Sequence, residues 1–183
     1  MGLRDIITKL KNNYSGNPKV ITLKDVKIKV EKLAAKIGAP DNLLPTYGYS
    51  KDGAWPHIEV LGNVLYYVVV ERGKELRRSS TINFDQLLYW IFVDVTFSMA
   101  VKYELAHRVE DKDSRRIIFL QQEKLLGLLN IKWQDKEAQR HHEILKNHPF
   151  DDLAGLRASY IAKLRRDGHT EIEIKKLTEK YPS

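Results

Sequence analysis

A long apolar stretch in the middle of the chain constrains the fold most. Residues 83–108 read NFDQLLYWIFVDVTFSMAVKYELAHR, and the run from Leu87 to Val101 is nearly all apolar, although Asp94 lies in its middle. A membrane-spanning helix needs about 20 uninterrupted apolar residues. This shorter run with a carboxylate is therefore typical of the central helix of a soluble core. Asn83 can cap the helix, with Gln86 at its third position.

The helical wheel of this stretch predicts a wide buried face and a narrow polar one. The apolar residues expected on the buried face are Leu87, Leu88, Trp90, Ile91, Phe92, Val95, Phe97, Met99, Val101 and Leu105. The polar arc is expected to hold Asp85, Gln86, Tyr89, Thr96, Tyr103, Glu104 and His107. We expect this helix to organise the fold.

Composition limits the classes of protein that the chain can belong to. The 183 residues fit one domain with a possible small appendage, and the absence of cysteine excludes disulfides, thiolate zinc sites and thiol nucleophiles. The start of the chain lacks the apolar core of a secretory signal, so we expect a cytoplasmic protein. The net charge of +7 arises at the two ends, because residues 79–152 hold 10 basic and 12 acidic side chains.

The first half of the chain predicts helices followed by a small sheet. A short helix is expected over residues 3–10, and a second from Thr22, its cap, to Gly38. From residue 45 the apolar period changes to two. The expected strands are Trp55–Leu61, Val64–Glu71 and Glu75–Thr81, with Gly62-Asn63 as a hairpin turn.

The second half predicts helices only. They are expected from about Ser114 to Leu129, from Trp133 to Asn147, and as a C-terminal pair in which Thr170 and Glu173 form a capping box. The fold class is α+β, with a short antiparallel sheet of about three strands packed against a long central helix and a mostly helical C-terminal half. We expect residues 1–152 to form one domain, and residues 153–183 to be a helical pair packed on it or appended.

Candidate catalytic and metal-binding residues are few. Asp94 on an apolar face would have a raised pKa if it were unpaired, but a structural ion pair with Arg115 or Arg116, or a hydrogen bond to Tyr66 or Tyr67, explains it as well. His141, His142 and His148 lack the spacing of a zinc site, so we interpret them as surface histidines. No glycine-rich phosphate loop or placed nucleophile occurs. We therefore expect no enzyme, cofactor or metal site.

The C-terminal helical pair is superficially similar to a helix-turn-helix. Arg165, Arg166, Lys175 and Lys176 could contact phosphates, which makes a DNA-binding regulator that uses basic terminal helices the alternative function. Glu171 and Glu173 stand where base-reading residues should lie and would repel DNA. We do not expect nucleic acid to be the partner.

The segment Tyr47–Glu59, YGYSKDGAWPHIE, predicts an interaction surface. Three aromatic residues surround a Ser-Lys-Asp-Gly loop, and aromatic residues on loops are common anchors of protein interfaces. The alternative is that these rings fold back onto the core helix. The candidate partner-binding residues are Tyr47, Tyr49, Asp52, Trp55, His57, Glu59 and Glu71. The acidic connection Glu110-Asp111-Asp113 is a second candidate contact or a solvated turn.

The chain resembles a family of bacterial immunity proteins from polymorphic toxin systems, immunity family 63. The resemblance rests on YGYSKDGAWPHIEV (Tyr47–Val60), YYVVVERGKE (Tyr66–Glu75), DQLLYWIFVDVTFSMAVKYELAHRVEDKDSRRIIF (Asp85–Phe119), LLGLLN (Leu125–Asn130), Trp133 and HHEILKNHPFDD (His141–Asp152). It covers roughly residues 45–152.

Membership of this family implies a small intracellular protein that binds and neutralises a cognate toxin domain and is not an enzyme. Many immunity proteins that cover nuclease toxins are acidic, and the charge of +7 departs from that pattern. The departure disfavours a nuclease partner, or confines the contact to the slightly acidic middle region. We expect occlusion of the toxin by the Tyr47–Glu59 loop and the adjoining hairpin, with no membrane involved. The oligomeric state is left open.

Overall fold

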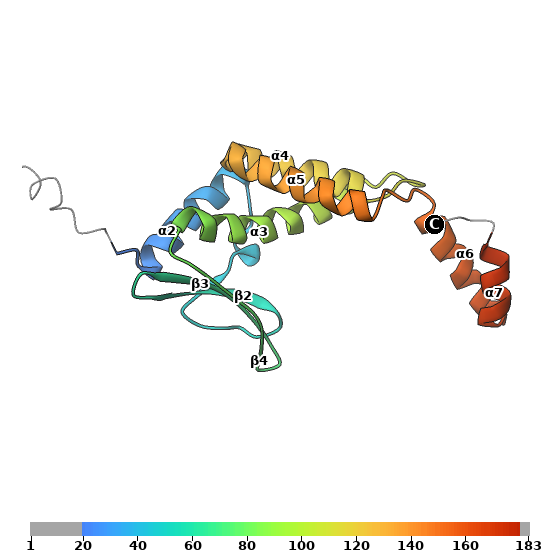
Figure 1. Ribbon diagram of the computed structural model, residues 1–183, viewed down its shortest axis with the longest axis horizontal. Coiled ribbons are helices and arrows are strands. Elements are labelled where there is room, and N and C mark those ends of the chain that lie inside the picture. Colours follow the sequence, from blue (N-terminus) through green and yellow to red (C-terminus); the bar gives the residue numbers. More distant parts are fainter. Residues whose placement is uncertain (1–19, 180–183) are drawn as a thin grey trace, which may run out of the picture. The chain divides into compact units, whose positions relative to one another are not determined.

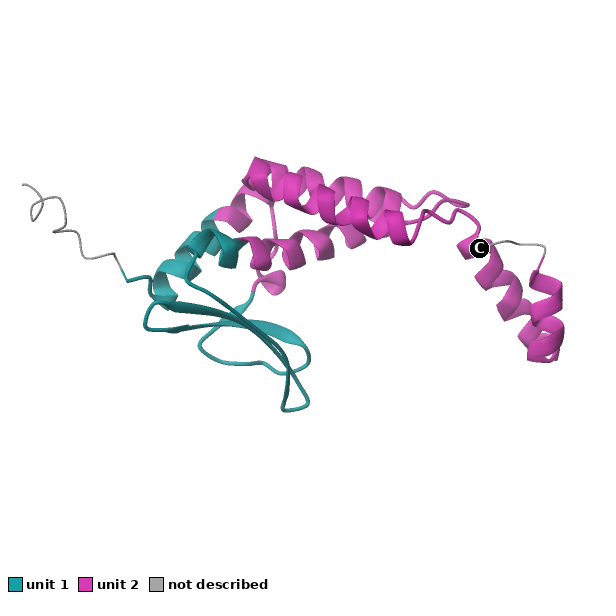
Figure 2. Ribbon diagram, viewed as in Figure 1, with its two compact units in different colours: residues 1–32, 45–88 teal, residues 33–44, 89–183 magenta. Residues whose placement is uncertain are grey.

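The computed structural model describes residues 20–179, and the helix expected over residues 3–10 lies outside them. The described chain is α+β, with a four-stranded sheet and six α-helices (Figure 1). It divides into two compact units, residues 1–32 with 45–88 and residues 33–44 with 89–183 (Figure 2). The division expected from the sequence, at residue 152, stays a prediction.

The first unit is built around the sheet, whose strand order is β1-β2-β3-β4. Its strands are β1 (Thr46–Tyr47), β2 (Trp55–Leu61), β3 (Val64–Glu71) and β4 (Lys74–Thr81). The β2–β3 and β3–β4 pairs are antiparallel, and β2 and β3 have the bounds that the sequence predicts. The sheet is mixed rather than antiparallel throughout, because β1 pairs with β2 in parallel.

The two hairpin turns follow from local backbone chemistry. Gly62 has φ 59°, which fits a two-residue turn with positive φ at its first central position. Arg72 and Gly73 both have positive φ, at 51° and 71°, as the tightest hairpin turns require. A register shift between Val69 and Val70 marks a bulge that helps to protect the exposed edge strand β4.

Helix α2 (Leu23–Ile37) begins and ends where the sequence predicts. The Thr22 hydroxyl accepts a hydrogen bond from the Asp25 backbone N–H at 3.2 Å, and the Asp25 carboxylate accepts one from the Thr22 N–H at 3.0 Å. After Ile37, Gly38 takes φ 65° and ends the helix. The apolar stripe of the helix is buried: Val26, Val30, Leu33, Ala34 and Ile37.

The second unit is helical. After the 3-10 turn η1 (Asp41–Leu43) it contains most of α3 (Phe84–Ala106), then α4 (Arg115–Leu129), α5 (Ile131–Asn147), α6 (Ala154–Arg166) and α7 (Glu171–Thr178). Figure 1 shows α4 and α5 side by side, joined at Asn130. On α3, Phe92 stacks on Trp133 of α5 with ring centroids 6.0 Å apart. Gln122 of α4 donates a hydrogen bond to the Val93 carbonyl at 3.1 Å.

The start of α3 is as predicted, but its buried face is partly different. The Asn83 side chain accepts a hydrogen bond from the Gln86 N–H at 3.2 Å and caps the helix. Three residues expected on the polar arc, Tyr89, Thr96 and Glu104, are buried, whereas Phe97 and Leu105 are 43% and 61% exposed. The physical reason is that apolar residues cover most of the circumference of α3, so its packing partners, rather than its own pattern, decide which face is buried.

Among the described helices, α3 is long and apolar enough to cross a membrane. In its most apolar stretch of 18 residues, 44% is buried. The core helix of a soluble protein meets the same description. Its buried polar side chains favour the core interpretation. The Tyr89 hydroxyl donates to Glu137 at 2.9 Å, and the Thr96 hydroxyl donates to the Phe92 carbonyl at 2.5 Å.

Candidate partner-binding surface

The loop between β1 and β2 is fixed by hydrogen bonds within the loop and to the neighbouring hairpin. Ser50 Oγ accepts a hydrogen bond from the Asp52 N–H at 2.9 Å, and the Ala54 N–H donates to the Val70 carbonyl of β3 at 2.9 Å. Asp52 Oδ1 accepts a longer bond, 3.4 Å, from the Gly73 N–H in the β3–β4 turn. Asp52 and Ala54 have positive φ, at 60° and 59°. These hydrogen bonds hold the loop against the β3–β4 hairpin.

Two of the sequence-predicted residues are open to solvent on this loop. Tyr49 is 59% exposed, and the Asp52 side chain is also exposed. Trp55, at the start of β2, is half-buried, and Lys51 Nζ lies 5.6 Å from the centroid of its ring. These residues form an exposed aromatic and charged surface, which we call the loop surface (Tyr49, Lys51, Asp52 and Trp55).

The sheet divides the remaining predicted residues between its two faces. Residues directly opposite in a ladder share a face, and successive residues alternate. Trp55, His57 and Glu59 therefore lie on one face of β2, whereas Tyr47, paired with Ile58, and Glu71, next to Val70, lie on the other. The predicted set is not a single surface.

Tyr47 belongs to the packed face of the first unit. Its hydroxyl is buried, without a hydrogen-bond partner among residues 20–179. Burial, and in smaller part the negative charge of Glu31 on α2, raise the pKa of Tyr47. The side chain of Tyr47 is half-buried, so it contributes to the packing of the sheet, and its role in partner binding stays a prediction.

His57 and Glu59 belong to a charged network that extends to β4. His57 is buried, and its Nε2 lies 3.0 Å from Glu59 Oε1. Arg78 donates to Glu59 Oε2 at 2.8 Å and to Glu75 at 2.9 Å, and its guanidinium lies 5.3 Å from the Tyr66 ring centroid. The hydrogen bond from Arg78 is the main cause that lowers the pKa of Glu59.

Sequence reasoning missed Arg78, Glu75 and Tyr66. The signal that could have found them is the hairpin register, because Arg78 lies opposite Val68, which lies opposite His57. The network holds its charged side chains in fixed positions, so a partner that binds here need not order them.

Only part of the acidic connection Glu110-Asp111-Asp113, in the second unit, is a solvated turn. Glu110 and Asp111 are exposed, and Asp111 has positive φ. Asp113 is nearly buried, and Arg115 Nη2 donates to it at 2.6 Å. The hydrogen bond from Arg115 is the main cause that lowers the pKa of Asp113 to about 2.

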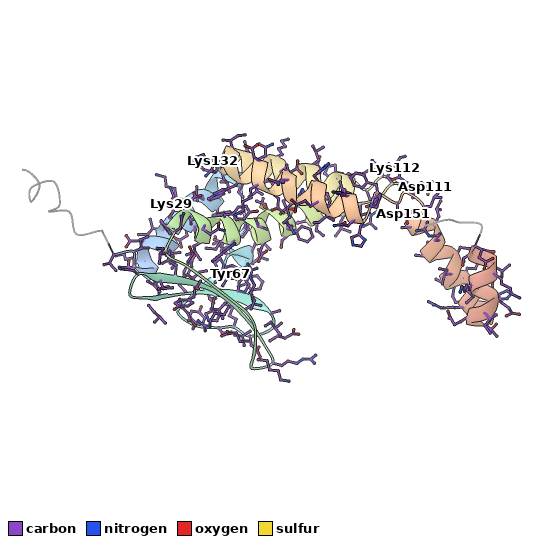
Figure 3. All side chains as sticks on the ribbon, in the orientation of Figure 1. Lys29, Tyr67, Asp111, Lys112, Lys132 and Asp151 are labelled. Atoms are coloured by element: carbon purple, nitrogen blue, oxygen red, sulfur yellow. The ribbon has the colours of Figure 1, made fainter. Side chains whose placement is uncertain are left out.

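Asp111, Lys112 and Asp151 lie close together at this connection (Figure 3). They line a polar cavity of about 540 Å³ with Arg115 and the first residues of α6. Among the acidic residues that line it, Asp113 and Asp151 are already paired with arginines of the same chain, whereas Glu110 and Asp111 are exposed.

The expectations for Asp94 and for His141 are both wrong about their surroundings. Asp94 is exposed rather than on a buried face, and its charge contributes, after Glu137 and Tyr89, to raising the pKa of Arg140. Arg115 and Arg116 bind Asp113 and Asp152 instead of Asp94. His141 is not a surface histidine, because it is buried.

Carboxylates flank the buried His141 on both sides. Its Nδ1 lies 2.6 Å from Glu123 Oε1 and its Nε2 3.3 Å from Glu137 Oε1, and its ring stacks on Phe119 at 3.8 Å. Within residues 20–179, no group of three or more His, Asp or Glu side chains could hold a metal ion.

The C-terminal pair carries the residues of the DNA-binding alternative. The capping box of α7 is present, with Thr170 and Glu173 bonded reciprocally. Arg165 Nε donates to Glu171 Oε1 at 2.9 Å, so one of the cations expected to contact phosphate is occupied by a carboxylate of α7.

Comparison with known proteins finds one similarity, in the middle of the chain. Residues 62–143 match the family model of Immunity protein 63. This part of the chain is therefore similar to immunity family 63. The matched segment runs from the β2–β3 turn through most of α5, so it includes Glu71 and Arg78 but not the loop surface. No curated protein and no solved structure shows significant similarity to the chain. Immunity proteins belong to toxin systems and generally act by binding rather than by catalysis.

Proposed function

We propose that this chain is an immunity protein that binds a cognate polymorphic toxin domain in the cytoplasm and neutralises it by occlusion. The observation that carries the proposal is the family match over residues 62–143, which covers two strands of the sheet and the helices that follow it. The toxin would be covered by a preformed protein surface, which requires no catalytic group in the inhibitor.

The loop surface supplies the anchors of this contact. Tyr49 offers an exposed ring, and Trp55 offers the edge of a half-buried one beside the Lys51 ammonium. Rigid aromatic side chains of this kind carry most of the binding energy at many interfaces. The neighbouring network of Glu59, Arg78 and Glu75 adds fixed charges that select the partner's orientation.

The test is protection of cells that express the toxin domain encoded beside this gene. Tyr49→Ala is expected to raise the dissociation constant at least about 30-fold, as for a residue worth 2 kcal/mol at an interface, and to abolish protection. The melting curve by circular dichroism should be unchanged, since the Tyr49 ring is exposed. Trp55→Ala should also abolish protection, with a small fall in melting temperature.

A matched control is Tyr160→Ala, which removes a half-buried tyrosine from α6, outside the loop surface. It should retain full protection. If wild-type protein neither protects nor binds the toxin domain, the proposed function is wrong. If Tyr49→Ala protects as wild type does, occlusion does not use the loop surface.

A further inference from the structure

An apolar groove belongs to the second unit, whereas the loop surface belongs to the first. Its volume is about 460 Å³, within the range of sites that accept a side chain or small ligand. The residues that line it come from the α2–η1 connection, η1, the C-terminal half of α3 with the residue that follows it, and α4. The lining residues are Gly38, Pro40, Leu43, Met99, Lys102, Tyr103, Ala106, His107, Gln121 and Leu125.

The walls of the groove are preformed. The rings of Tyr103 and His107 stack with centroids 4.0 Å apart, and His107 Nδ1 lies 2.9 Å from the Tyr103 carbonyl oxygen. This contact fixes the plane of the imidazole over the last turn of α3. Tyr103 is nevertheless 41% exposed, so a large part of its surface remains for a ligand.

The charges of the groove define what it can hold. Among the described residues that line it, none is acidic, and Lys102 contributes an ammonium group to a lining that also includes the apolar side chains of Leu43, Met99 and Leu125. Asp41 of η1 is exposed and does not belong to the lining. An apolar group that carries a carboxylate matches this arrangement, because its body would be desolvated while its charge pairs with Lys102.

We propose that this groove is a second contact for the toxin domain, and that it accepts an apolar side chain of the toxin with a neighbouring carboxylate. The inference rests on the proposed function and extends it to a second surface. It also agrees with the family match, because every lining residue from α3 and α4 lies within residues 62–143. The loop surface precedes that segment.

The chemistry of the groove is tested first on the full chain without toxin. The probe is 4-phenylbutyrate, with the neutral 4-phenylbutan-1-ol as its matched control, in a titration followed by ¹H–¹⁵N NMR. The carboxylate should shift the amide signals of Gly38, Met99 and Gln121, and Lys102→Glu should weaken its binding at least about fivefold. Equal binding of acid and alcohol, or shifts scattered elsewhere, would show that the groove has no such preference.

The partner is tested by calorimetric titration with the toxin domain encoded beside this gene. Lys102→Glu, which reverses the charge, and Ala106→Trp, which fills the groove, should each raise the dissociation constant at least about tenfold. Lys124→Glu is the matched control, since Lys124 is an exposed lysine of α4 outside the groove, and it should bind as wild type does.

The outcomes separate the two proposals. If wild-type protein binds the toxin and both groove variants bind equally well, the groove is not a toxin contact, although the proposed function stands. If wild-type protein does not bind the toxin at all, the proposed function fails and the docking proposal fails with it. Circular dichroism on Ala106→Trp and the charge-only variant Lys102→Glu together exclude misfolding as the cause of lost binding.

Discussion

Glu137 is the residue on which the polar packing between α3 and α5 depends. Its side chain has no exposed surface, and it accepts hydrogen bonds from the Tyr89 hydroxyl at 2.9 Å and from Arg140 at 2.6 Å. A buried carboxylate is tolerated only when its oxygens are bonded in this way. Removing it leaves a tyrosine hydroxyl and a guanidinium without their partner.

Glu137→Ala is therefore expected to lower the free energy of unfolding by about 3 kcal/mol, as for the loss of one partner of a buried pair. Urea unfolding measures the change. Glu143→Ala on the exposed side of the same helix is the control, with an expected change within about 0.5 kcal/mol. Equal effects of the two substitutions would mean that the Glu137 cluster contributes nothing to stability.

The same residue predicts how stability depends on pH. Burial alone would raise the pKa of Glu137, but its contacts with His141, Arg140 and Tyr89 outweigh burial and lower the pKa to about 2. A carboxyl whose pKa is lower in the folded state than in the unfolded state stabilises the folded protein at pH values above the unfolded-state pKa, near 4.3. This stabilisation is lost as pH falls towards 2.

The expected result is a urea midpoint that falls steadily between about pH 5 and pH 2. Glu137→Gln should start from a lower midpoint at pH 7 and fall less steeply, because its amide does not titrate. Asp113, whose pKa is also lowered to about 2, chiefly by Arg115, should account for part of the remaining slope. An identical slope in wild type and Glu137→Gln would contradict this assignment.

Single residues also show which parts of the site could be predicted from the sequence and which could not. Tyr49 and Asp52 are exposed as the sequence suggests, because a loop with glycine and positive φ keeps them outside the sheet. His57 is equally polar in sequence but is buried beside Glu59. Arg78, which donates to Glu59, is 19 residues away from it, so only the strand register reveals the network.

At the scale of the element, local chemistry was sufficient for most boundaries. Gly62-Asn63 fixes the β2–β3 hairpin, and Thr22 and Asn83 cap the helices that follow them. By contrast, β1 has two residues and pairs in parallel with β2. It therefore depends on a non-local contact, which the pattern of the sequence does not predict. The buried side of α3 depends on α5 in the same way.

The junction of α4 and α5 gives a prediction for a single cap. The Asn130 side chain accepts a hydrogen bond from the Lys132 N–H at 3.0 Å, and its extended backbone separates the two helices. Asn130→Ala is expected to cost about 1 kcal/mol of stability, because that donor loses its partner.

Thermal unfolding and hydrogen exchange of the first turn of α5 measure this loss. Gln139→Ala, an exposed position in the middle of α5, is the control and should leave both nearly unchanged. Faster exchange confined to the first turn would support the cap. Unchanged exchange in Asn130→Ala would show that the helix start is fixed by packing, for instance by the buried Trp133.

At the scale of the whole molecule, the C-terminal helices contrast with the rest of the second unit. Between them, α6 and α7 bury only Leu164 and Ile174 among their described hydrophobic residues, and Leu156 and Ile172 are exposed. Their ion pair Arg165–Glu171 is exposed and so contributes little. The family match also ends at residue 143, before α6 begins.

Deletion of residues 153–183 is therefore expected to leave folding and toxin protection intact. The shortened chain keeps Asp152, whose carboxylate binds Arg116 at 3.0 Å and the Asp113 N–H at 2.9 Å, but loses the pair between Asp151 and Arg157. Loss of one partly exposed pair costs up to about 1 kcal/mol, which lowers the melting temperature by roughly 2–4 °C. Arg157→Ala in the full chain should reproduce that fall, because it removes the same pair while keeping both helices. A much larger fall in the deletion than in Arg157→Ala, or loss of protection, would mean that residues 153–183 belong to the folded domain rather than being appended to it.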